Sequence, residues 1–147
     1  MRHILAITLL SVIVAAVCPP DGTAQCKVFV KGACIPVLNP YIHDGSYQAA
    51  IMSEGEEAEV YKTVFAGQQY RLYVCVDQVM PDVEFVVSDI HRNILFDSRK
   101  NGNVRQWDFR PDASQQIKVT VRIPVRKENN ENPTIGCVGV FFGLKEK

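Results

Sequence analysis

Two histidines outside the N-terminal apolar segment each lie close to an acidic residue. His43 precedes Asp44, and His91 follows Asp89 by two positions. An imidazole can act as a general base when a carboxylate orients it toward a nucleophile. Both pairs lie among turn-forming residues, and the sequence contains none of the common hydrolase or phosphate-binding motifs. A small hydrolase is therefore the third of three hypotheses, and we expect no enzyme activity, no catalytic residue and no cofactor.

Aromatic side chains next to a basic residue could bind a ligand. Tyr73 shares one face of a predicted strand with Arg71, and Trp107 is the one tryptophan of the chain. Arg71, Tyr73 and Trp107 are therefore candidate ligand-binding residues, and an exposed aromatic row would indicate a carbohydrate-binding accessory domain, which is the second hypothesis. The alternative is that these rings are ordinary core residues or cover disulfides.

Acidic side chains and cysteines are the possible metal ligands of this sequence. Oxygen ligands of the type that calcium takes recur in turns, at Glu54–Glu59 and between Asp89 and Asp108, but their spacing matches no calcium loop. The cysteines lack Cys-x-x-Cys spacing, and no histidine lies near them. The sequence therefore predicts no metal site.

The N-terminus has the pattern of a secretory signal peptide. Met1–Arg2–His3 is basic, and Ile4–Val17 is apolar but shorter than the roughly 20 residues that span a bilayer. Small residues at Gly22 and Ala24 favour cleavage before Gln25, so residues 1–24 are predicted to be the signal peptide and 25–147 a single domain. Two alternatives remain open, namely cleavage after Ala16, which keeps Cys18, and a lipoprotein acylated at Cys18.

Four cysteines follow the predicted signal peptide, and an even number in an exported chain indicates two disulfides. They are Cys26, Cys34, Cys75 and Cys137. Three connectivities exist for four cysteines. We favour Cys26 with Cys34, across a short Lys-Gly-Ala turn, and Cys75 with Cys137, which lie in two strong strands predicted to be neighbours.

Alternation of apolar and polar residues predicts strands along most of the chain. The clearest is Gly67–Asp77, in which Tyr70, Leu72, Val74 and Val76 share one face. The stretch 117–125 alternates in the same way, and Trp107 and Phe109 mark the core side of 104–110. The result is an all-β, antiparallel β-sandwich of about eight strands, jelly-roll-like, without a convincing amphipathic helix.

Turn residues predict how these strands connect. Residues 58–65 and 67–77 are expected to form one hairpin, and 83–87 and 94–97 another. The charged stretch 126–133 is expected to be a hairpin loop before the last strand, 134–144. Cys26–Val30 and Cys34–Leu38 are expected to be edge strands, and 47–53 a short strand.

Charge excludes some partners. The formal net charge of the whole chain is zero, and removing residues 1–24 takes away one charge of each sign, Arg2 and Asp21. A nucleic-acid or anionic-membrane surface would need a basic excess.

The motifs resemble those of secreted bacterial jelly-roll sandwiches. Gly67–Cys75, Phe85–Asp89 with Ile94–Asp97, and Gly136–Val140 are loosely similar to pre-peptidase C-terminal domains, and more so to small uncharacterised exported proteins of Gram-negative bacteria. The resemblance implies fold and export and carries no catalytic residue. The leading hypothesis is an exported, secreted or periplasmic, non-enzymatic binding or envelope-associated module with an unknown protein or glycan partner.

Overall fold

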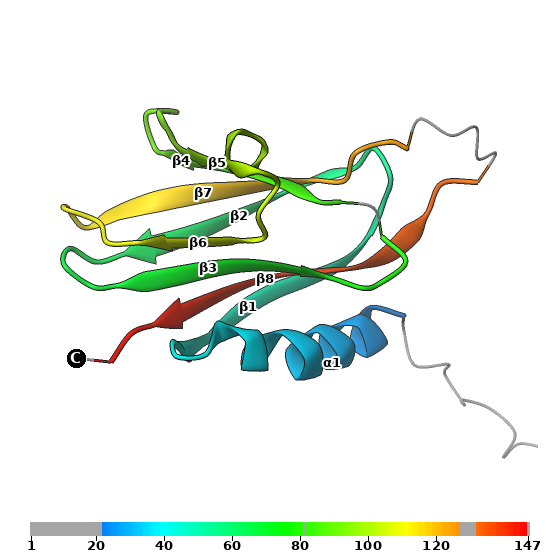
Figure 1. The fold of residues 1–147 in the computed structure, drawn as a ribbon, viewed down its shortest axis with the longest axis horizontal. Helices are drawn as coiled ribbons and strands as arrows, with labels where there is room; N and C mark the ends of the chain where they lie inside the picture. Colours follow the sequence, from blue (N-terminus) through cyan, green and yellow to red (C-terminus); the bar gives the residue numbers. More distant parts are fainter. Residues whose placement is uncertain (1–21, 81, 127–131, 147) are drawn as a thin grey trace, which may run out of the picture.

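The computed structural model describes residues 22–80, 82–126 and 132–146 and shows two four-stranded antiparallel sheets packed face to face (Figure 1). Sheet A has the order β1-β8-β3-β6, and sheet B has the order β2-β7-β4-β5. The strands of sheet A are β1 (Ile42–Ser53), β8 (Ile135–Leu144), β3 (Tyr70–Val76) and β6 (Gln106–Phe109), and those of sheet B are β2 (Glu57–Val64), β7 (Gln115–Arg122), β4 (Glu84–Asp89) and β5 (Ile94–Asp97).

The pairing is that of a jelly roll, as predicted. β1 pairs with β8, β2 with β7, β3 with β6 and β4 with β5, so the first strand meets the last and each successive pair nests inside it. The predicted antiparallel neighbours β3 and β8 are confirmed, and so is the β4–β5 hairpin.

The core lies between the sheets and follows the predicted alternation. Leu72 and Val74 of β3 face Phe85 and Val87 of β4 across the sandwich interior, and Ile117, Val119 and Val121 of β7 complete that layer. Each of these side chains is buried. Burying a side chain of this size stabilises the fold by about 1.5–3 kcal/mol, which makes the inner faces the main source of stability.

Two predicted hairpins are wrong because the chain changes sheet at those points. β2 belongs to sheet B and β3 to sheet A, so the turn around Gly67, where φ is 74°, crosses between layers. β7 and β8 are separated in the same way. The loop predicted for 126–133 lies partly outside the described residues. Turn residues indicate that a chain reverses, but not whether the next strand pairs beside the last or crosses to the other sheet.

The N-terminal part of the chain is helical, against the prediction of two edge strands. α1 (Gly22–Cys34) is followed by a 3-10 turn, η1 (Ile35–Leu38), and together they lie across the outer face of sheet A (Figure 1). The buried residues Cys26, Val30 and Cys34 are spaced by four, as one face of a helix requires. The residues predicted to flank the signal-peptide cleavage site, Ala24 and Gln25, lie inside α1; residues 1–21 lie outside the description.

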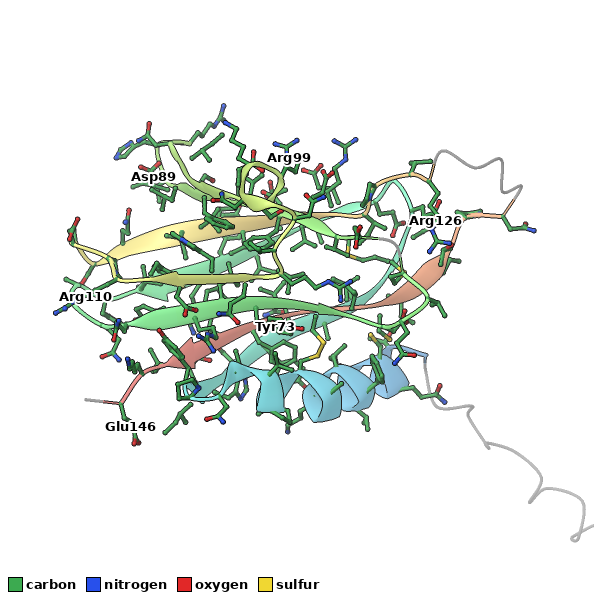
Figure 2. All side chains as sticks on the ribbon, viewed as in Figure 1. Tyr73, Asp89, Arg99, Arg110, Arg126 and Glu146 are labelled. Carbon is green, nitrogen blue, oxygen red and sulfur yellow. A yellow bond between two sulfur atoms is a disulfide. The ribbon has the colours of Figure 1, made fainter. Side chains whose placement is uncertain are left out.

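The helix is held to the sheet by a disulfide that differs from the favoured pairing. Cys34 at the end of α1 is bonded to Cys75 of β3, with a Cα–Cα distance of 5.9 Å, whereas Cys26 and Cys137 carry free thiols (Figure 2). Cys26 cannot reach Cys34, because eight residues of helix separate them by about 12 Å. Cys75 is opposite Gly139 in the register, two residues away from Cys137.

Glycines of β8 allow the helix to approach closely. A Cβ built on Gly139 would lie 3.2 Å from Val30 Cβ and 2.7 Å from the Phe141 ring, and one on Gly143 would lie 2.8 Å from Tyr41 Cβ. Within the described residues, no helix has the length and apolar character needed to cross a bilayer.

We expect Gly139→Ala to lower the free energy of unfolding by about 1–3 kcal/mol, because the added methyl group overpacks the contact between β8 and α1. The matched control is Gly32→Ala, since nothing lies within 4 Å of a Cβ on this helical glycine. That substitution should raise the free energy of unfolding by roughly 0.5–1 kcal/mol. Urea denaturation measures both, and an unchanged stability for Gly139→Ala would contradict the described packing.

Candidate functional site

The sandwich has two long sides, and they differ in how they are closed. One side lies between β6 and β5, the other between β1 and β2, because these four strands are the edges of their sheets. β6 and β5 are four residues long, and β1 is twelve. The side that includes β1 therefore exposes the longest unpaired strand edge among the described residues.

Stacked aromatic rings seal the β5–β6 side. Trp107 stacks on Phe109 with ring centroids 4.1 Å apart and on Phe96 at 5.2 Å, while Phe85 and Tyr70 extend the row at 5.3 Å each. Such pairs stabilise a core beyond the area that they bury. Trp107 is thus part of a core seam, and its placement favours the structural alternative over the predicted ligand-binding role.

The β1–β2 side is open, because small side chains face inward there. Ala50 from β1 and Val60 from β2 face each other across a groove of about 460 Å³ whose floor is formed by Val138 and Val140 of β8. A second hollow of about 180 Å³ shares Gln48, Val60, Tyr61 and Val140 with the first and continues it along β1. We call this continuous hollow the edge groove, and its lining residues are Ser46, Tyr47, Gln48, Ala49, Ala50, Met52, Glu59, Val60, Tyr61, Lys62, Thr63, Val138, Val140 and Phe142.

The edge groove ends at an ion pair and at a turn. Lys62 of β2 reaches across to β1, where its Nζ lies 2.5 Å from Asp44 and 2.6 Å from the Ser46 hydroxyl. At the other end, Gly55 in the β1–β2 turn donates its N–H to the Ile123 carbonyl at 2.8 Å. Tyr47–Met52 of β1 therefore bounds the open part of the groove, which is about 17 Å long at the rise of a strand.

The β1 edge carries no charge over the length of the groove. The sequence Tyr47–Met52 is Tyr-Gln-Ala-Ala-Ile-Met, and Ile51 is 42% exposed. The pairing with β8 is regular there, since the bulge of β1 lies before Tyr47. Edge strands are usually protected from pairing by charges, prolines, bulges or short length, and this stretch of β1 has none of them.

The charged rim of the groove belongs to β2. Lys118 of β7 donates to Glu59 at 2.7 Å, and the Tyr61 hydroxyl donates to the other oxygen of Glu59 at 2.9 Å. The hydrogen bonds from Lys118 and Tyr61 lower the pKa of Glu59, and the bond to Glu59 raises the pKa of Tyr61. The Lys118–Glu59 ion pair is thus charged at neutral pH. Its contribution to the stability of the fold is lost as the pH falls through the lowered pKa of Glu59.

Arg71 is occupied by contacts within the protein. Its guanidinium forms a two-pronged ion pair with Asp108, at 2.8 and 2.6 Å, and donates to the Asn39 carbonyl at 3.0 Å. It also lies over the Tyr41 ring, 4.3 Å from the centroid. These contacts fasten the segment after η1 to sheet A, and they favour a structural role over the predicted ligand-binding role.

Tyr73 lies under α1, between the helix and sheet A, close to the Cys34–Cys75 bridge (Figure 2). Tyr73 is on the outer face of sheet A, opposite the core side of β3, as predicted, but α1 covers that face. Among the described residues, the three candidate ligand-binding side chains therefore do not form one site.

The histidines do not assemble a catalytic site. His43 is in β1 of sheet A, where its ring packs on Phe141 with centroids 5.7 Å apart, and His91 is in the turn between β4 and β5 of sheet B. Among the described residues, no side-chain hydrogen bond joins either imidazole to a carboxylate. The arrangement required by the hydrolase hypothesis is absent from this part of the chain.

The acidic side chains considered for calcium bind groups of the protein. Asp89 accepts hydrogen bonds from His91 N–H and from both the backbone and side chain of Asn93, and these bonds lower its pKa. Asp97 accepts two from the Arg99 guanidinium, and Asp108 pairs with Arg71. No group of three potential metal ligands occurs in the described ranges.

No protein-family model matches the chain, and no curated protein matches it. The resemblance to pre-peptidase C-terminal domains is therefore not confirmed. Among solved structures, the crystal structure of Aeromonas hydrophila PliG, a periplasmic lysozyme inhibitor of g-type lysozyme, is similar with 10% sequence identity and a TM-score of 0.48. The match covers 67% of this chain and 84% of that chain.

We expect Glu59→Gln to lower the pKa of Tyr61 toward its ordinary value and to lower the pKa of Lys118, because both groups lose the carboxylate that raises their pKa. Glu57→Gln is the matched control, since Glu57 is exposed on the same face of β2. Titration of the tyrosine ring resonances by NMR measures the effect. An unchanged Tyr61 pKa in Glu59→Gln would mean that the described rim contacts do not form.

Proposed function

We propose that the protein is an exported, non-enzymatic binding protein that takes an extended segment of another polypeptide along the free edge of β1. One observation carries this proposal: the longest strand of the fold lies at a sheet edge, uncharged from Tyr47 to Met52, beside the open edge groove. An extended peptide that adds a strand to such an edge gains main-chain hydrogen bonds, and pockets for alternate side chains provide specificity.

The groove sets the chemistry of the segment. A strand added to β1 continues sheet A, so alternate side chains point into the hollow between the sheets. The hollow is lined on its floor by Val138 and Val140 and is apolar there, which favours medium-sized apolar side chains. Its length of about 17 Å accommodates about five residues of extended chain. The preferred segment is therefore short and uncharged, with apolar residues at every second position.

A second copy of this chain fits the groove less well. An antiparallel β1–β1 pair would offer Gln48, Ala50 and Met52 to the hollow, and of these Gln48 is polar and Ala50 is too small to fill it. A glycan is disfavoured because sugars are held by rows of exposed aromatic faces, whereas Trp107 and Tyr73 are packed within the protein and Tyr61 is a single exposed ring at the groove. The carbohydrate-binding and hydrolase hypotheses are accordingly alternatives without a supporting site.

Export and location outside the cytoplasm rest on two features. The basic start followed by the apolar segment Ile4–Val17 has the pattern of a signal peptide. The Cys34–Cys75 bridge is a structural disulfide, and such bridges persist in secreted and periplasmic proteins. Both features support a secreted or periplasmic, envelope-associated protein.

We expect a synthetic Lys-Leu-Thr-Leu-Thr-Leu-Lys peptide to shift the amide resonances of residues 47–52 and to protect them from hydrogen exchange, because a strand added to β1 pairs with their backbone groups. Titration into the isotope-labelled protein, followed by NMR, measures both effects. A peptide of the same composition with its leucines grouped together should bind at least tenfold more weakly, since it lacks the alternation.

Ala50→Arg should weaken binding of the alternating peptide at least tenfold, because the long charged side chain enters the groove from an exposed position and leaves the core intact. Ala113→Arg makes the same change at an exposed turn residue between β6 and β7 and should leave the affinity unchanged. Equal affinities for the two variants, resonance shifts confined to other strands, or self-association through β1 in the absence of peptide would each contradict the proposal.

A further inference from the structure

One face of α1 carries two cysteines that are separated by a valine. Cys26, Val30 and Cys34 are spaced by four residues and are all buried against sheet A. Cys34 is bonded to Cys75 of β3, which fixes the C-terminal end of the helix. Cys26 lies near the N-terminal end of the helix, about two turns from Cys34, and has no disulfide to another described cysteine.

The strand beneath the helix is β8, and its outward residues alternate in a matching way. Cys137, Gly139, Phe141 and Gly143 face α1 and the segment after it, as the close approaches at the two glycines show. A Cβ on Gly139 would lie 3.2 Å from Val30 Cβ, whereas Leu38 Cβ lies 3.6 Å from a Cβ on Gly143. The helical segment and β8 therefore run in the same direction, with Val30 above Gly139.

The register of the helix on β8 places Cys26 above Cys137. Moving back four residues from Val30 along the helix covers about 6 Å, and moving back two residues from Gly139 along the strand covers about 6.7 Å. Because these two distances match, Cys26 lies over Cys137 in the same way as Val30 lies over Gly139. The Cβ separation at Val30 and Gly139 is already below the 3.5–4.5 Å that a disulfide needs, so the two backbones lie close enough for a bridge.

Contacts of the two thiols agree with this placement. Cys26 Sγ lies 3.5 Å from the carbonyl oxygen of Ala50, the neighbour of Ile51, which is directly opposite Cys137 in the β1–β8 register. Cys26 and Cys137 pack in the same cluster beneath the helix. The pKa of Cys137 is raised to about 12. Burial is the largest cause, and a hydrogen bond with the Cys26 thiol is the second. The two thiols therefore lie in one cluster, between α1 and the β1–β8 pair.

We propose that Cys26 and Cys137 form a second disulfide, which ties the N-terminal end of α1 to β8. The oxidant is an external disulfide, either of a small thiol such as glutathione or of a thiol oxidoreductase. One cysteine thiolate attacks this disulfide and releases one thiol, and the second cysteine then attacks the mixed disulfide and releases the other. Two electrons and two protons pass to the external disulfide, which leaves as two thiols.

The bridge forms before the helix has packed. A buried, protonated thiol attacks disulfides slowly, because the thiolate is the nucleophile. Exchange is fast only while Cys137 is still exposed, during folding. Once both bridges are present, the two ends of α1 are attached to two neighbouring strands of sheet A, β3 and β8, and the helix cannot leave the sheet without reduction.

Peptide mapping tests the pairing directly. The purified protein is refolded from denaturant in mixed reduced and oxidised glutathione, then unfolded, treated with an alkylating reagent and digested with trypsin. Cleavage after Lys27, Lys62, Arg71 and Lys127 puts the four cysteines in separate peptides. Fragmentation of the peptide that ends at Lys27 distinguishes Cys26 from Cys18 where both are present.

We expect a Cys26–Cys137 peptide and a Cys34–Cys75 peptide, no alkylation at these four residues, and a mass that rises by about four hydrogens on reduction. Alkylation of both Cys26 and Cys137 after such refolding would overturn the proposal, as would a link from either residue to another cysteine. This outcome is independent of the peptide-binding proposal, which concerns the free edge of β1 and the groove between the two sheets.

Serine variants provide the matched controls. Cys26→Ser should leave Cys137 as the one new alkylated residue, and Cys137→Ser should do the reverse, with the Cys34–Cys75 peptide retained in both. In the wild-type protein, refolding with and without the disulfide donor should give melting temperatures that differ by roughly 10 °C or more, which tests the bridges without any substitution. Equal melting temperatures would contradict the proposal.

Discussion

The structure depends on the apolar outer face of sheet A, which has to be covered. Tyr47, Tyr73, Cys75 and Phe141 project from this face, and α1 shields them from water. β8 is consequently buried on both sides, since Val138, Val140 and Phe142 face the sandwich core while Phe141 faces the helix. The closeness of the two layers favours glycine at 139 and 143, where a Cβ would lie 2.7 Å from the Phe141 ring and 3.2 Å from Val30 Cβ, and 2.8 Å from Tyr41 Cβ, respectively. Within the described ranges nothing covers sheet B in this way, and the polar outward faces of β2 and β7 agree with exposure to solvent.

The inner layer could be predicted from the sequence because its signal is local. Tyr70, Leu72, Val74 and Val76 alternate with other residues at period two, and burial at every second position of β3 and β7 follows directly. The helix was missed because its sequence, Gly-Thr-Ala-Gln-Cys-Lys-Val-Phe-Val-Lys-Gly-Ala-Cys, contains valines, phenylalanine and glycine, which favour strands or turns. Its stability comes from packing against β8 and from the bridge at Cys34, and both are contacts with residues more than forty positions away.

The candidate site was missed for a different reason. Alternation assigns Gln48, Ala50 and Met52 to one face of a strand, but it does not say whether that strand is at the edge of a sheet. The edge position follows from the pairing of the first strand with the last, which turn residues do not encode. Trp107 illustrates the converse, because its ring looked available for a ligand until the fold brought Phe96 of β5 onto it, beside Phe109 of its own strand. The uncharged run Tyr47–Met52 is the sequence signal for this site, but it can be interpreted only when β1 is known to lie at a sheet edge.

The pairing of β1 with β8 also determines when the protein can fold. Synthesis delivers β1 long before β8, the strand that pairs with it among the described residues, and β2 likewise waits for β7. Folds dominated by contacts of this range form slowly, because the entropy of closing long loops is lost before the contacts are gained. Neither sheet can be completed on the ribosome before nearly the whole chain has emerged. The strand order alone therefore prevents the polypeptide from completing its native sheets until β7 and β8 have been synthesised.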